Sequence, residues 1–137
     1  MKRRSLSKGQ AFRGFFVATA AFFAVFASTA VPIPLYATYQ ATIGLTNTEI
    51  SFTMLAYLGG VILTLLLAGR LSDALGRKAT TFVALLLAVA GCTLFLFAAD
   101  AGAILTARFV QGVAGGLAMS AVSALIVDCI SDYRMGW

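Results

Sequence analysis

Few side chains in this chain are suited to chemistry, and one of them, Arg108, stands alone inside a long apolar run. The run extends from about residue 103 to residue 127 and contains no other charged residue. If it crosses a membrane, a cation at this depth costs about 2.5 kcal/mol or more on insertion scales, so it is expected to face a cavity or a partner group. The alternative is that the guanidinium extends to the nearby interface and is solvated there.

Small side chains follow Arg108 at intervals of four residues and therefore share its helix face: Gly112, Gly116, Ser120 and Ala124. Small residues at this spacing let two helices approach closely within a membrane. The pattern predicts that a second helix packs on this face and holds the cation inside a bundle.

Two tyrosines are candidates for polar groups that line an aqueous cavity. Tyr36 ends the first apolar run, and Tyr57 lies in the second. Anchoring at the membrane interface is an equal alternative for Tyr36, and ordinary packing or a hydrogen bond to a neighbouring helix is the alternative for Tyr57.

The longest polar interruption after the N-terminal tail is the stretch 69–78, GRLSDALGRK. We interpret it as a tight turn between two helices. Gly69 is expected to end the first helix, Gly76 to provide a position without Cβ, and Asp73 to cap the helical turn that follows. A generic loop held inside the cell by its positive charges is the alternative.

Metal, cofactor and enzyme sites are not predicted. The chain has no histidine, and its two cysteines, Cys92 and Cys129, lie near different ends of separate apolar runs, so neither a metal cluster nor a disulfide framework is indicated. No nucleophile–base pair or phosphate-binding glycine loop is recognisable. A nucleic-acid partner is not expected despite the net charge of +5, because the basic residues lie between apolar runs.

Composition points to lipid as the environment of the chain. Of its 137 residues, 61% are hydrophobic and 11% are charged, whereas soluble domains carry about 25% charged residues. The predicted fold class is all-α, a polytopic membrane protein with four transmembrane helices. We place the spans at about residues 15–36, 50–68, 79–99 and 103–127.

The first run contains two features that affect its shape and packing. Pro32 and Pro34 are expected to break or kink its outer end. Ala20, Ala24 and Ser28 recur every four residues, which predicts that another helix packs closely on that stripe.

The segment 37–48 is predicted to be an outside loop, because it contains turn formers and no Lys or Arg. Thr46 and Glu49 at its end have the spacing of a capping box for the second helix. That helix carries its own stripe of small residues at Ala56, Gly60, Thr64 and Ala68.

The basic residues are distributed asymmetrically. Of the ten Lys and Arg residues, all but Arg108 lie in the tail 1–14, in the stretch 69–78 or after the last run. The connecting segments 37–48 and 99–102 contain none. The positive-inside rule therefore predicts a multi-pass protein of the cell membrane with a cytoplasmic N-terminal tail and both termini inside.

The spacing G-x-x-x-D-x-x-G-R-K between a second and a third span resembles the loop signature of the major facilitator superfamily, G-x-L-A-D-R-x-G-R-K. The matching residues are Gly69, Leu71, Asp73, Gly76, Arg77 and Lys78, and the departures are Ser72 and Ala74. In that family an acidic residue at the inner end of the fourth span pairs with the loop arginine. The resemblance therefore implies a cluster of Asp73, Arg77 and Asp128 that locks the state closed to the cytoplasm.

The fourth run also resembles a signature of this family, R-x-x-Q-G-x-G. Arg108, Gln111 and Gly112 match it, and Ala114 departs from it. In proton-driven drug exporters of the family the matching arginine is implicated in proton transfer or substrate binding. We therefore assign these three residues, with the two tyrosines named above, to a candidate pathway for substrate or protons.

The family fold has twelve spans in two halves, with the substrate bound between them. The resemblance implies that residues 15–137 are part of the N-terminal half of a secondary transporter, truncated relative to the whole. Its expected partners are the lipid bilayer, a small-molecule substrate with proton coupling, and the remaining helices of the transporter. Export of small amphipathic compounds is the leading expectation for the intact protein.

Two other functions fit four spans. A small multidrug exporter that works as a dimer has a similar length, but that class depends on a glutamate inside its first helix, and the first run here has no acidic residue. A membrane scaffold or regulatory subunit without transport activity is the second alternative.

Overall fold

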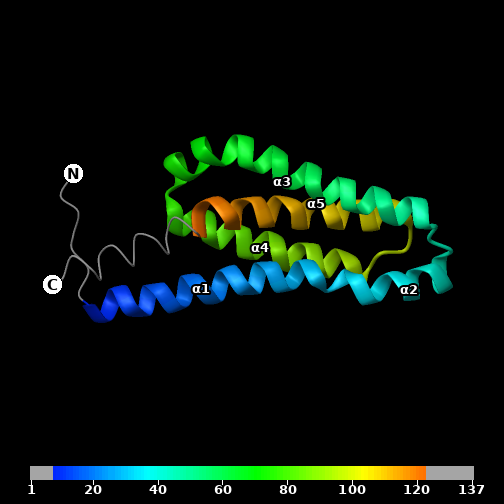
Figure 1. Ribbon diagram of the computed structural model, residues 1–137, viewed down its shortest axis with the longest axis horizontal. Helices are drawn as coiled ribbons and strands as arrows, with labels where there is room; N and C mark the ends of the chain where they lie inside the picture. Colours follow the sequence, from blue (N-terminus) through cyan, green and yellow to red (C-terminus); the bar gives the residue numbers. More distant parts are fainter. Residues whose placement is uncertain (1–7, 123–137) are drawn as a thin grey trace.

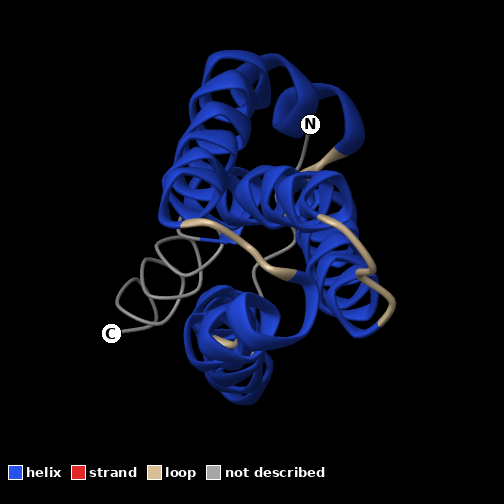
Figure 2. Cartoon of the chain, turned by 90° about the vertical axis from the view of Figure 1, so that its right-hand side faces the viewer, coloured by secondary structure: helices blue, strands red, loops and turns tan. Residues whose placement is uncertain are grey.

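The computed structural model describes residues 8–122, and every element in that range is helical (Figures 1 and 2). The elements are α1 (Lys8–Ala30), α2 (Pro32–Ile43), α3 (Asn47–Leu75), α4 (Arg77–Leu96), α5 (Ala101–Leu117) and a π-helical turn, η1 (Ala118–Val122). Four stretches are long and apolar enough to span a bilayer: Phe12–Ile43, Asn47–Leu67, Lys78–Leu96 and Ala101–Ser120. The predicted all-α fold with four spans is confirmed.

The ends of the helices gather at two sides of the bundle (Figure 1). The start of α1, the turn between α3 and α4, and the end of α5 lie together at one side. The connections from α2 to α3 and from α4 to α5 lie at the other side. This up-and-down order is the one that four successive membrane crossings require.

The helix α5 lies at the centre and packs most extensively on α3 and α4. Its apolar window is 56% buried, compared with 17% for each of the first two spans. The outward faces of the other helices carry large apolar side chains, as expected of surfaces in contact with lipid. Examples of these exposed residues are Phe16, Phe23, Leu55, Leu66, Phe82 and Val89.

The first span is broken at Pro32, as predicted, but the segment after it differs from the prediction. Most of the expected loop 37–48 is helical, because α2 continues to Ile43. Proline is well suited to the first turn of a helix, where no amide donor is required. Pro34 lies in the same first turn and is tolerated there, and no further breaker follows until Gly44, which caps α2 in the left-handed conformation with φ of 70°. At its other end α1 begins at Lys8, within the predicted tail.

The capping box at the start of α3 is confirmed. The backbone N–H of Thr46 donates to Glu49 Oε2 at 2.8 Å, and the backbone N–H of Glu49 donates to Thr46 Oγ1 at 3.2 Å. The two residues thus satisfy each other's amide groups at a helix end where the helix itself provides no acceptor.

The turn between α3 and α4 is shorter than predicted. The helix α3 passes through Gly69 and Asp73 to Leu75, so our expectation that Gly69 ends it is wrong. One glycine costs a helix about 1 kcal/mol, which the surrounding helix-forming residues outweigh. The N-cap of α4 is Gly76, not Asp73. Gly76 has φ of 84°, which confirms it as the position that requires a residue without Cβ.

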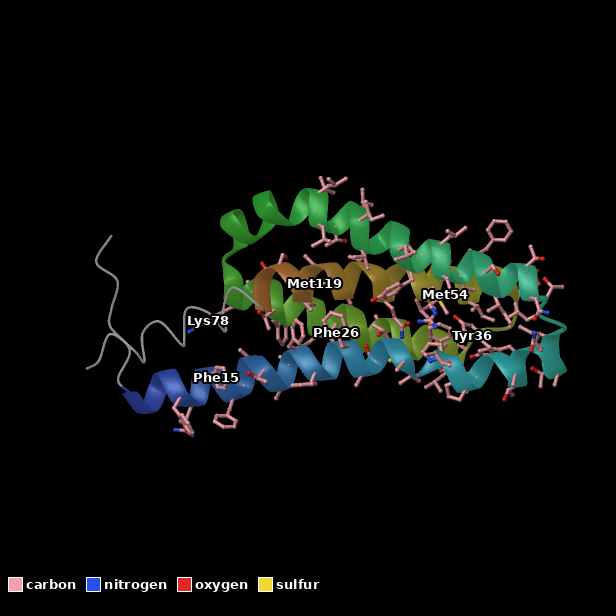
Figure 3. The ribbon with its side chains drawn as sticks, in the orientation of Figure 1. Phe15, Phe26, Tyr36, Met54, Lys78 and Met119 are labelled. Atoms are coloured by element: carbon pink, nitrogen blue, oxygen red, sulfur yellow. The ribbon has the colours of Figure 1, made fainter. Side chains whose placement is uncertain are left out.

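The predicted packing stripe on α1 is also wrong for this bundle. Ala20 and Ala24 are exposed, and α1 instead buries Ala18 and Val25. Phe22 and Phe26 pack on the same core cluster, their rings 4.6 Å apart. Figure 3 shows Phe26 between α1 and α4. The inward face is therefore the one that carries Phe22 and Phe26, each of which buries more apolar area than an alanine, while Phe16 and Phe23 of the same helix stay exposed.

Asp100 forms the N-cap of α5, and its replacement by alanine is expected to destabilise the bundle by about 1 kcal/mol. Its side chain accepts a hydrogen bond from the backbone N–H of Ala103 at 2.8 Å. Asp100→Asn retains the acceptor and serves as the control. Chemical unfolding of the two variants in detergent measures the difference, and equal stabilities would contradict the capping role.

Candidate functional site

The contact between α3 and α5 is formed by glycines that bring two backbones together. A Cβ on Gly60 would lie 2.5 Å from the carbonyl oxygen of Phe109, and one on Gly112 would collide with the carbonyl oxygen of Tyr57. A Cβ on Gly116 would lie 2.8 Å from Thr64 Cβ. The predicted close approach on the face of Arg108 is therefore confirmed, and α3 is the partner helix.

Arg108 lies inside the bundle with 3% of its surface exposed, so it does not extend to the interface. Its Nε donates to Tyr36 Oη at 2.6 Å, and its Nη1 donates to the main-chain carbonyl of Thr29 at 2.9 Å. The guanidinium carbon lies 5.3 Å from the centre of the Tyr36 ring and 5.8 Å from that of Phe95. Both distances are within the range of cation–π attraction.

The charge of Arg108 is balanced by dipoles and rings. No carboxylate forms an ion pair with it among the side chains that the structure describes. Its Nη2 is buried and has no hydrogen-bond partner within the described part of the chain. Leaving a buried donor without an acceptor lowers the stability of the fold. The site is therefore not optimised for stability alone.

Tyr36 connects Arg108 to α3. Its hydroxyl shares a hydrogen bond of 2.8 Å with Thr53 Oγ1, and Thr53 is fully buried. Figure 3 shows Tyr36 pointing from α2 into the bundle. The interfacial-anchor alternative for Tyr36 therefore does not describe its position, because its hydroxyl is inside the bundle.

Gln111 lies one turn from Arg108 and is fully buried. Its Nε2 donates to the carbonyl of Ser28 at 2.9 Å and lies 3.8 Å from Cys92 Sγ, and its Oε1 is 3.4 Å from Arg108 Nη1. The site thus joins α1, α2, α3, α4 and α5 around two neighbouring side chains of one helix.

Tyr57 is placed apart from this network. A Cβ on Gly115 would lie 3.2 Å from the Tyr57 hydroxyl oxygen, so the ring covers α5 at that glycine. The structure therefore groups Arg108, Gln111 and Tyr36 together, and it places Tyr57 in the contact between α3 and α5.

The loop signature is described only in part. Gly76 and Lys78 are exposed, and Lys78 lies at the side of the bundle where α1 begins (Figure 3). The side chains of Asp73 and Arg77 are not described, and Asp128 lies outside the described residues. The predicted cluster of these three charges stays a prediction.

Sequence reasoning missed the partners of Arg108 and Gln111 on the first span. These partners are main-chain carbonyls of Ser28 and Thr29, which have no signal of their own in the sequence. The available clue was Pro32, and it pointed only to Ser28, because a proline leaves the carbonyl four residues before it without a donor. Metal ligands do not gather in the described part of the chain, where no three His, Cys, Asp or Glu side chains come together.

Four membrane-length helices around a buried cation define a multi-pass membrane protein. The family comparison is more specific, since residues 17–136 match the model of the Major Facilitator Superfamily. The chain belongs to this family of membrane transporters, which are not enzymes. No solved structure matches it significantly.

Several curated bacterial relatives carry the name multidrug resistance protein MdtL. The one from Shewanella sp. strain ANA-3 is 38% identical over 96 residues, which are 67% of this chain and 23% of the relative. The one from Vibrio parahaemolyticus is 30% identical over 64% of this chain and 22% of the relative. The one from Citrobacter koseri is 27% identical over 69% and 24%. The matched part of the chain thus spans about a quarter of the length of these relatives.

Proposed function

We propose that this chain supplies the first four spans of a proton-coupled secondary transporter that exports small amphipathic molecules. The family membership supports transport, and the names of the relatives support multidrug export as the activity of the whole protein. The observation that carries the proposal is the buried guanidinium of Arg108 with its unpartnered Nη2. A bundle that needed only stability would be better served by an apolar side chain at this position.

A guanidinium does not release its proton in a protein, so Arg108 acts through charge and hydrogen bonding. The N–H donors of Arg108 can bind an acceptor group of the substrate or a carboxylate elsewhere in the transporter. The two compete for these donors as the carboxylate binds and releases the transported proton. Tyr36 and Gln111 hold the guanidinium during this exchange. Gly112 and Tyr57 set the spacing between α3 and α5 beside the pathway.

We further propose that the tail, the start of α1 and the Gly76 turn face the cytoplasm in the cell membrane. The start of α1, which carries Lys8 and Arg13, and the exposed Lys78 lie toward one side of the bundle, which supports this orientation (Figures 1 and 3). The signature residues at the end of α3, at the turn and at the start of α4 then take part in the conformational change of the transporter: Gly69, Asp73, Gly76, Arg77 and Lys78. Asp128 pairs with Arg77 in the state closed to the cytoplasm.

A chimera tests this function directly. Residues 17–136 replace the matching segment of the Shewanella sp. strain ANA-3 relative, and uptake of a panel of amphipathic dyes and antibiotics into everted vesicles is measured, because export from the cytoplasm is uptake in this orientation. We expect transport driven by the proton gradient, with its rate falling to background when a protonophore is added. The unmodified relative is the control for assay conditions.

The outcomes separate the parts of the proposal. A chimera that is folded and inserted but moves no compound of the panel moved by the parent would contradict the assignment of residues 17–136 to an exporter. Transport that persists after the protonophore would contradict proton coupling. Stable co-purification of the 137-residue chain with a defined membrane complex, without transport, would favour the scaffold alternative.

A further inference from the structure

Pro32 leaves a gap in the hydrogen bonding of the first span. In a continuous helix the amide of residue 32 would donate to the carbonyl of Ser28, but proline has no amide hydrogen. Ser28 and Thr29 also belong to the last turn of α1, which ends at Ala30, where carbonyls have no partner within the helix. Inside a membrane protein such carbonyls are costly unless another donor reaches them.

Side chains of neighbouring helices fill this gap. Gln111 Nε2 donates to the Ser28 carbonyl at 2.9 Å, and Arg108 Nη1 donates to the Thr29 carbonyl at the same distance. Cys92 Sγ lies 4.0 Å from the Ser28 carbonyl. The lack of a side chain at Gly91 makes room for Gln111, since a Cβ there would lie 2.6 Å from Gln111 Cγ.

The backbone at the break remains close to helical. Val31, between α1 and α2, has φ of −52° and ψ of −42°. An amide hydrogen at residue 32 would therefore point toward the Ser28 carbonyl without a large rearrangement. Pro34 likewise leaves the carbonyl of Ala30 without its helical donor, but at the Ser28 carbonyl the missing group is one donor, and Gln111 supplies it.

The two sides of the break are attached differently. On α2, Tyr36 bonds to Thr53 of α3, and Tyr39 Oη donates to the carbonyl of Phe95 on α4 at 2.6 Å. On α1, the hydrogen bonds to α5 reach the two carbonyls just before the break. Release of these carbonyls would free the end of α1 while α2 stays in place.

We propose that Gln111 is a positioning residue that substitutes for the amide hydrogen absent at Pro32, and that residues 28–32 form a hinge held closed by this bond. When Gln111 releases Ser28, α1 pivots away from α4 and α5 about Val31. This inference concerns the 137-residue chain itself and does not rest on its transporting anything.

The test is a double-mutant cycle read out by the reactivity of Cys92. The full chain carries Cys129→Ser, so that Cys92 is its remaining thiol, and N-ethylmaleimide labelling is timed in lipid nanodiscs. Gln111→Met removes the donor and keeps the side-chain length. Pro32→Ala restores the amide donor to Ser28. Gln40→Met is the matched control, since Gln40 is exposed and bonds only to Asn47 among the contacts described for it.

We expect Gln111→Met to raise the labelling rate about three- to tenfold, the equivalent of one hydrogen bond. In the Pro32→Ala background the same substitution is expected to change the rate less than about twofold. The comparison corrects for the direct contact between Gln111 and Cys92, because that contact is lost in both backgrounds. Gln40→Met should leave the rate unchanged.

An equal effect of Gln111→Met in both backgrounds would overturn the proposal, since Gln111 would then act by packing alone. If Gln111→Met does not fold, size-exclusion chromatography replaces labelling as the readout. Recovery of a monodisperse protein on adding Pro32→Ala would support the proposal, and failure in both backgrounds would overturn it.

Discussion

Replacement of Gly112 by valine is expected to separate α3 from α5 and to abolish the folded bundle. The new side chain would collide with the carbonyl oxygen of Tyr57, a backbone atom that cannot move without displacing α3. Gly60→Val produces the reciprocal collision with the carbonyl oxygen of Phe109. Overpacking of this kind between two backbones costs about 3 kcal/mol or more, which is a large part of the stability of a small bundle.

The neighbour of Gly60 provides the control for this prediction. Gly59 is exposed, and a Cβ on it would have nothing within 4 Å. Gly59→Val is therefore expected to change the free energy of unfolding by about 0.5 kcal/mol or less. Unfolding in mixed micelles, followed by circular dichroism, compares the three variants. If Gly60→Val and Gly59→Val unfolded alike, the close packing of α3 on α5 would be wrong.

Replacement of Arg108 by methionine is expected to lower transport by the chimera more than tenfold while leaving the protein folded. Methionine fills a similar volume, and exchanging a buried charge for an apolar side chain is often neutral or stabilising. The hydroxyl of Tyr36 keeps its bond to Thr53 in the variant, whereas the Thr29 carbonyl loses its donor at a cost of about 1 kcal/mol, which is too little to unfold the bundle. Transport by Arg108→Lys is expected to be impaired as well. The single ammonium group of lysine cannot replace the two guanidinium nitrogens that donate to Tyr36 and to Thr29.

Initial transport rates in everted vesicles, with thermal unfolding measured in parallel, test this prediction. Arg13→Met is the control, since Arg13 is exposed at the start of α1 and the tail retains its other basic residues. If the Arg108→Met variant transported as fast as the unsubstituted chimera at equal expression, Arg108 would not be part of the transport pathway. Loss of folding together with transport would assign it a structural role instead.

The sequence predicted those parts of the fold that depend on local chemistry. Local rules that act over a few residues predict the four apolar runs of membrane length, the capping box at Thr46 and Glu49, and the position without Cβ at Gly76. The end of α3 did not follow, because a single helical glycine such as Gly69 does not by itself stop a helix. The helix propensities of the neighbouring residues decide whether α3 continues past this glycine.

The parts that depend on which helices meet could be predicted less well. A stripe of small residues predicts close packing, and this held for Gly112 on α5 but not for Ala20 and Ala24 on α1. The stripe does not say whether a partner helix is present, and on α1 the face that packs is instead that of Ala18, Phe22 and Val25. Likewise, the burial of Arg108 could be anticipated from its position, but the carbonyls that it binds could not.

The proposed topology has the chain crossing the membrane four times, with the Gly76 turn between α3 and α4 on the cytoplasmic side. Thr42 and Lys78 are exposed near opposite sides of the bundle, and each can be replaced by cysteine in a variant that lacks Cys92 and Cys129. A membrane-impermeant maleimide applied to intact cells is expected to label Thr42→Cys at once and Lys78→Cys only after permeabilisation. Labelling of Lys78→Cys in intact cells, with Thr42→Cys protected from the reagent, would contradict this topology.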